Sequence, residues 1–232
     1  MSWLRDPRIV LLRRPVSVTI GRGGFMPILA LGLLFAGFGA RVGLPVIAAA
    51  MVGALGGTAS LIAHELGHVR AARKLSGLRP VSVSLIWLGA ATRLEGAYAS
   101  GRDQARVAIA GPATSLGLAL LLTPVLFAPI PKSAKGLMLT LILLNLIIAA
   151  LNLIPANPLD GYKVIVGLIW SLIGTEMSAR RLIRRVASAW IVLELAGACF
   201  LLVEKPALGL TVLVMAAGLY GQKIFARRSS RA

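Results

Sequence analysis

Long apolar stretches separated by short basic gaps constrain this chain more than any other feature. Stretches of about 18 residues or more with few charges recur along the 232 residues, and a helix of roughly that length crosses a hydrocarbon core of about 30 Å. The hydrophobic fraction of 57% and the mean hydropathy of +0.84 do not suit a soluble globule. One such stretch could be a buried core helix, but several in a short chain predict an integral membrane protein in contact with a lipid bilayer.

The predicted fold class is an all-α polytopic membrane protein with about six transmembrane helices. We expect a single transmembrane domain over residues 1–232, with its core at about 44–174. The expected spans are 25–40, 44–70, 103–128, a broken span over 136–173, a fifth ending near 203, and 206–225.

Two segments interrupt the helical pattern. Within Pro80–Gly96, residues Val81, Val83 and Leu85 alternate with serines, which is the period of a strand, so we expect a small membrane-associated β-hairpin. Residues 154–161 carry two prolines and a glycine inside the fourth span. We interpret that span as one broken helix, because irregular backbone at membrane depth is tolerated only where protein or a water-filled cavity surrounds it.

The formal charge of +17 is spread over the gaps between apolar stretches instead of forming one face or tail. This distribution favours topology signals over a nucleic-acid site, so no nucleic-acid partner is expected. With six spans, most lysines and arginines fall on one side of the membrane together with both termini. The positive-inside rule then predicts a multi-pass protein of the cell membrane with both termini in the cytoplasm.

The segment His64–His68, with the sequence HELGH, has the pattern of a metal site. His64 and His68 are four residues apart, so on a helix they project from one face, and Glu65 lies beside them to accept a proton from a metal-bound water. This is the H-E-x-x-H arrangement of zinc hydrolases. These are the only two histidines in the chain. A structural polar cluster is the alternative, but the cost of burying these groups at a membrane-helix end favours function.

A catalytic zinc takes three protein ligands and keeps a further position for water or substrate. Asp160 is the predicted third ligand, because it lies in the broken helix at membrane depth. The alternative is a turn residue that caps the following helix. Two imidazoles and one carboxylate make one Zn²⁺ per chain the expected cofactor. Other acidic residues are not chosen as the third ligand, because they lie near expected membrane interfaces, where water can solvate their charges. They are Asp6, Glu95, Asp103, Glu176 and Glu204.

Asn152 and Asn157 approach or enter the break. An amide there could donate to a developing oxyanion or bind an unwound substrate backbone. Satisfying the backbone groups freed by the two prolines is at least as good an explanation for each, and both interpretations stay open.

Three motifs in order resemble the site-2 protease family of intramembrane metalloproteases, in a minimal form without its PDZ or CBS modules. Besides HELGH, they are Ala110–Ala113 (AGPA) and the pair Asn152–Pro155 (NLIP) and Asn157–Gly161 (NPLDG). Tyr162 departs from the pattern, since many members have a second glycine there, and we expect this to alter local packing only.

The resemblance implies zinc bound by His64, His68 and Asp160, with Glu65 as general base. It also implies that the hairpin pairs with an unwound substrate segment by strand addition. The expected function is an intramembrane zinc metalloprotease that cleaves in or near transmembrane segments of membrane-anchored proteins. Regulated intramembrane proteolysis, with a regulatory membrane partner, is its expected setting. The rival is a non-enzymatic membrane protein that binds or transports zinc, which would need ligands but no general base.

Overall fold

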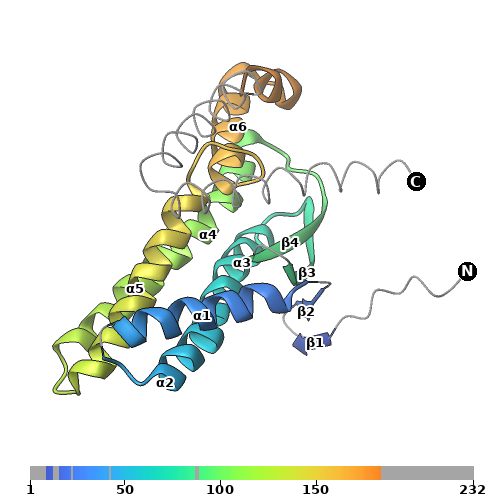
Figure 1. The fold of residues 1–232 in the computed structure, drawn as a ribbon. Coiled ribbons are helices and arrows are strands. Elements are labelled where there is room, and N and C mark those ends of the chain that lie inside the picture. The colour runs from blue at the N-terminus through green and yellow to red at the C-terminus, as the bar shows by residue number, and fades with distance from the viewer. Residues whose placement is uncertain (1–8, 13–15, 22, 42, 87–88, 184–232) are drawn as a thin grey trace, which may run out of the picture.

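The computed structural model describes residues 9–12, 16–21, 23–41, 43–86 and 89–183. Its helices and strands are shown in Figure 1. The strands are β1 (Ile9–Leu12), β2 (Ser17–Ile20), β3 (Leu78–Ile86) and β4 (Gly89–Gly96). The helices are α1 (Phe25–Arg41), α2 (Val46–Met51), η1 (Val52–Gly57), α3 (Thr58–Ala72), α4 (Gly101–Leu122), η2 (Thr123–Phe127), α5 (Lys132–Asn152) and α6 (Asp160–Ile173).

Three helical segments are long and apolar enough to cross a membrane: Val46–Ala72, Gly101–Phe127 and Lys132–Asn152. Helix α1 is a shorter apolar helix. These four correspond to the first four predicted spans, and α6 continues the fourth span beyond its break. The fifth and sixth predicted spans lie outside the described residues, so a total of six stays a prediction.

The first long segment joins α2, the π-helical turn η1 and α3 into one continuous rod. Its glycines allow α1 to approach closely. A Cβ added at Gly53 would lie 2.6 Å from the Cβ of Phe35, whose side chain is buried. Small residues at such crossings let membrane helices pack backbone against backbone. This continuous helix, packed on α1, therefore fixes the position of the HELGH segment within α3.

A four-stranded sheet lies beside the helices, in the order β1-β2-β3-β4. Strands β3 and β4 form the predicted hairpin and pair antiparallel, whereas β2 pairs parallel with β3 and antiparallel with β1. The protein is therefore mostly helical with a small sheet, and the sheet is larger than the sequence analysis predicted. Strand β2 alternates only in residue type, with apolar Val18 and Ile20 following polar Ser17 and Thr19, and four residues are a weak signal.

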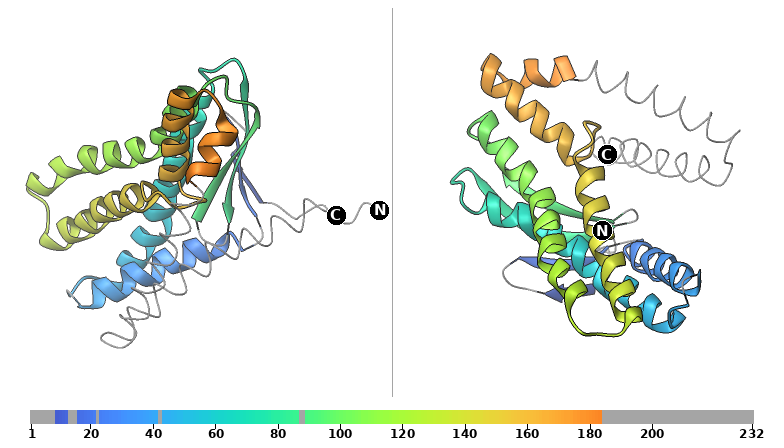
Figure 2. Two further views of the ribbon diagram at one scale, coloured as in Figure 1. Left: turned by 90° about the horizontal axis from the view of Figure 1, so that it is seen from above. Right: turned by 90° about the vertical axis from the view of Figure 1, so that its left-hand side faces the viewer.

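Helix α3 lies between the sheet and α4. Val18, Val69 and Val83 form one buried cluster that joins the sheet to α3. Helix α4 in turn packs on α3, α5 and α6. The α4–α6 contact is close, because Gly101 and Gly167 face each other without side chains. Helices α1, α4 and α5 extend away from the sheet to one side (Figure 2). The HELGH segment consequently has the sheet on one flank and α4 on the other.

Candidate metal centre

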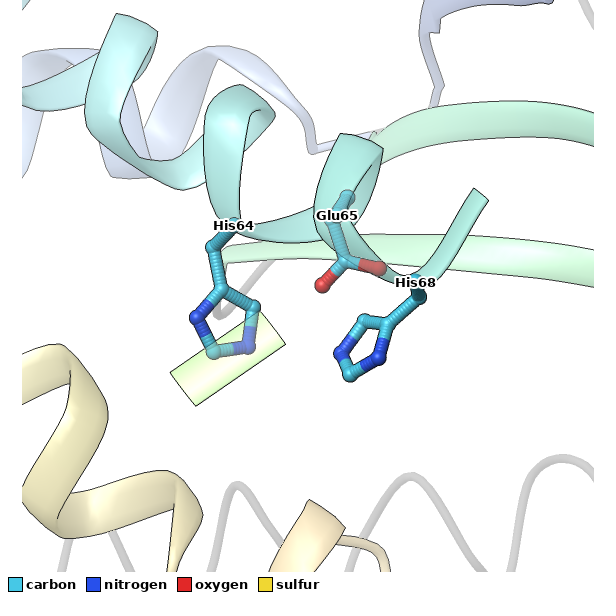
Figure 3. Close-up of side chains that lie close together, drawn as sticks. All are labelled: His64, Glu65 and His68. Atoms are coloured by element: carbon cyan, nitrogen blue, oxygen red, sulfur yellow. The ribbon is translucent and has the colours of Figure 1, made fainter. Parts of the chain in front are cut away.

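The two histidines of α3 project to one side of the helix with the Glu65 carboxylate beside them (Figure 3). Their rings lie 5.1 Å apart between centroids and meet edge to face. Both histidines are buried, while Glu65 is partly exposed. Ligand atoms of His64, Glu65 and His68 all lie within 4.8 Å of one another. The helical spacing therefore produces the shared face that the sequence predicted.

Asp160 reaches the same point from α6. Its Oδ2 lies 3.1 Å from His64 Nε2 and 2.9 Å from His68 Nε2, and the side chain is buried. Helix α5 ends at Asn152 and α6 begins at Asp160, so the break in the fourth span delivers this carboxylate. Its other oxygen, Oδ1, accepts a hydrogen bond of 2.9 Å from Lys163 Nζ, one turn along α6. The structure thus joins the three predicted ligands across more than 90 positions.

Helix α4 orients both imidazoles through their Nδ1 atoms. His68 Nδ1 donates to the carbonyl oxygen of Val107 at 2.7 Å, which leaves His68 Nε2 unprotonated in the neutral ring. His64 Nδ1 lies 2.9 Å from Ser115 Oγ, and donation to that oxygen gives the same tautomer. Metal-binding histidines are commonly held in this way through the second ring nitrogen.

Gly111 provides the space in which the two rings meet. A Cβ at this position would lie 2.6 Å from His64 Nε2 and closer still to His68 Nε2. No residue with a side chain fits there while the rings keep their places. This gives the AGPA segment of α4 a physical reason, which is close approach to the imidazoles.

The Glu65 carboxylate is held by the sheet. Thr92 of β4 donates from Oγ1 to Glu65 Oε2 at 2.6 Å, and the same hydroxyl lies 3.2 Å from the backbone oxygen of Glu65. The sequence motifs did not point to Thr92, Ser115 or Lys163. Ser115 carried a detectable signal, because it is a polar residue one turn after Gly111 in a predicted membrane helix.

The two asparagines behave differently. Asn152 Nδ2 donates to the Ile148 carbonyl at 2.9 Å, one turn back in its own helix. Asn157 lies in the break before Pro158, joined by a cis peptide bond, and its side chain makes no hydrogen bond to another described residue. Their suggested substrate or oxyanion roles stay predictions.

The donor set fits a zinc ion. Two imidazole nitrogens and one carboxylate oxygen meet, and each ring has its second nitrogen engaged. Bonds of about 2.0–2.1 Å in a tetrahedral site separate neighbouring ligand atoms by about 3.3 Å. The observed separations of 2.9 and 3.1 Å between Asp160 Oδ2 and the ring nitrogens are close to that value. Small adjustments of these side chains would admit the ion.

The fold is that of a site-2 protease. The solved structure of the site-2 protease from Methanocaldococcus jannaschii superimposes with a TM-score of 0.61 at 19% sequence identity, over 92% of each chain. The resemblance predicted from the ordered motifs is therefore confirmed at the level of the fold.

Sequence relatives are named as zinc metalloproteases. A Synechocystis protein called "Putative zinc metalloprotease sll0528" is 36% identical over 57% of this chain and 35% of its own length. "Putative zinc metalloprotease Rip3" of Mycobacterium tuberculosis is 35% identical over 59% of this chain and 36% of its own. The zinc metalloprotease MJ0392 of M. jannaschii is 35% identical over 46% and 31%. The chain spans about a third of the length of these relatives, and no family model matches it.

Proposed function

We propose that this protein is an intramembrane zinc metalloprotease that hydrolyses peptide bonds in or near transmembrane segments of membrane-anchored proteins. The observation that carries the proposal is the meeting of His64, His68 and Asp160 beside Glu65. His64, Glu65 and His68 lie near one end of the apolar helical segment Val46–Ala72, which is long enough to cross a bilayer. The names of the sequence relatives and the site-2 protease fold support the same conclusion.

In this proposal His64 Nε2, His68 Nε2 and one Asp160 oxygen hold one zinc ion. When bound, zinc supplies Lewis-acid chemistry, polarising the scissile carbonyl and lowering the pKa of water towards about 7. Ser115 and the Val107 carbonyl keep the imidazole nitrogens aimed at the site. Lys163 holds Asp160 Oδ1, so the Oδ2 atom is the one presented to the metal.

Glu65 is the proposed general base. Its carboxylate takes a proton from the attacking water as the new C–O bond forms at the substrate carbonyl. It then delivers that proton to the leaving amine as the C–N bond breaks, so the carboxylate is regenerated. Zinc binding alone would require no such group.

The proposed setting is a lipid bilayer, with both termini in the cytoplasm and a transmembrane protein as substrate. A regulatory membrane partner is part of this proposal. Asn152 and Asn157, at the break before Asp160, are the proposed secondary contacts for an unwound substrate backbone.

The test is cleavage of a panel of single-span membrane proteins by purified, zinc-loaded protein. Glu65→Gln keeps the size of the side chain and removes the base, and we expect turnover to fall by about 10²–10⁴-fold, the usual contribution of a general base. Glu176→Gln is the matched control, because Glu176 lies beyond α6, away from the sheet, and pairs with Arg180. A chelator should abolish cleavage and zinc should restore it. Stoichiometric zinc binding without cleavage of any panel member would favour the zinc-binding or transport alternative.

A further inference from the structure

We infer that Thr92 is a positioning residue for the general base, which orients the Glu65 carboxylate and connects it to the outer strand of the sheet. This inference rests on the proposed function, because it assigns a role relative to Glu65. It adds a residue that lies outside the predicted site motifs, 27 positions beyond Glu65.

The contact between the two side chains is short. A length of 2.6 Å from Thr92 Oγ1 to Glu65 Oε2 falls in the range of a hydroxyl donating to a charged carboxylate. A hydroxyl has one hydrogen, and the backbone oxygen of Glu65 is the more distant acceptor at 3.2 Å. Donation to Oε2 is therefore favoured. It fixes the rotation of the carboxylate and leaves the other oxygen, Oε1, to take up a proton.

Thr92 is itself held rigidly, so it can fix the orientation of the Glu65 carboxylate. Its β-branched side chain has few rotamers, so the hydroxyl direction is set by the strand. Thr92 is paired with Val83 of β3, which is fully buried and packs with Val69 of α3. The strand pair is thus fixed to the same helix that carries Glu65. A base supported by a rigid element keeps the geometry that proton transfer requires.

The position of β4 gives this contact a further consequence. Strand β4 is at the end of the described sheet, paired with β3 along one edge. Where a substrate segment adds to the other edge, its register on β4 is also its register relative to Thr92, and through Thr92 relative to Glu65. The hydroxyl thereby links the place where a substrate strand would pair to the group that acts on it.

The test compares Thr92→Val with Thr92→Ser in the cleavage assay. Valine keeps the shape and removes the hydroxyl, whereas serine keeps the hydroxyl. We expect Thr92→Val to lower kcat by about 10- to 100-fold, a part of the general-base contribution, with zinc stoichiometry unchanged. Thr92→Ser should restore kcat to within about threefold of wild type, since the donor to Glu65 remains. Thr19→Val is the matched control, because it removes a threonine hydroxyl of the same sheet that meets Ser84 at 2.9 Å.

The outcomes separate the two proposals. An active wild type beside a Thr92→Val variant of unchanged kcat overturns the inference alone. Equal loss in Thr92→Val and Thr92→Ser, or loss in the Thr19→Val control, also overturns it, because such losses report packing of the sheet. Should valine prevent folding, Thr92→Ala replaces it with the same expectation. A zinc-loaded wild type that cleaves nothing overturns the proposed function first, and the inference with it.

Discussion

Replacing Gly111 by alanine tests whether the imidazoles meet where the structure places them. The added Cβ would lie 2.6 Å from His64 Nε2 and closer to His68 Nε2. Non-bonded heavy atoms normally approach to about 3.5 Å, so the rings must retreat by about 1 Å. Ligand distances in a metal site hold to within about 0.2 Å. The required movement of the rings is therefore several times the variation in ligand distance that a metal site accepts.

The expected result is a fall in zinc affinity of at least about 100-fold, the upper end of the loss seen when an outer-shell partner is removed. That corresponds to about 2.8 kcal/mol. Helix propensity alone predicts the opposite sign for stability, because alanine is favoured over glycine in a helix by about 1 kcal/mol. The clashing atoms are the far ends of two side chains, so we expect Gly111→Ala to fold while losing the metal.

The assay is competition for zinc with a chromophoric chelator on purified protein in detergent, with circular dichroism to check the fold. Gly117→Ala is the matched control, because it makes the same change in the same helix and its Cβ would meet nothing within 4 Å. Wild-type zinc affinity in Gly111→Ala would refute the reasoning. An equal loss in Gly117→Ala would show that the effect belongs to the helix rather than to the site.

Two further substitutions test the supports of the site. Ser115→Ala should weaken zinc binding by about 10- to 100-fold in the same competition assay, because His64 Nδ1 loses its partner. Thr123→Ala should bind zinc as wild type, because the Thr123 hydroxyl donates to the Ala119 carbonyl at the end of α4. Gly167→Ala should destabilise the protein by about 1–3 kcal/mol, since its Cβ would lie 2.5 Å from the Gly101 carbonyl oxygen. An unchanged thermal unfolding temperature would contradict the close α4–α6 packing.

Local patterns made much of the fold predictable. The apolar stretches gave four helical segments close to their observed bounds, and alternation in residues 80–96 gave the β3–β4 hairpin. Strand β1 and strand β2 were missed. Strand β2 finds its parallel partner about 65 positions away, as in the pairing of Ser17 with Ser82, and such a pairing has no local signal.

The sequence by itself determined that His64, Glu65 and His68 share a helix face, because four residues make about one turn. It also singled out Asp160, because a carboxylate in a broken membrane helix is costly without a partner. Only the tertiary structure decided that Asp160 Oδ2 lies between the two rings, that α4 has a glycine where they meet, and that Thr92 donates to Glu65. Helical periodicity and the cost of burying a carboxylate can be read from a local stretch of sequence. These contacts depend instead on how distant helices and strands pack.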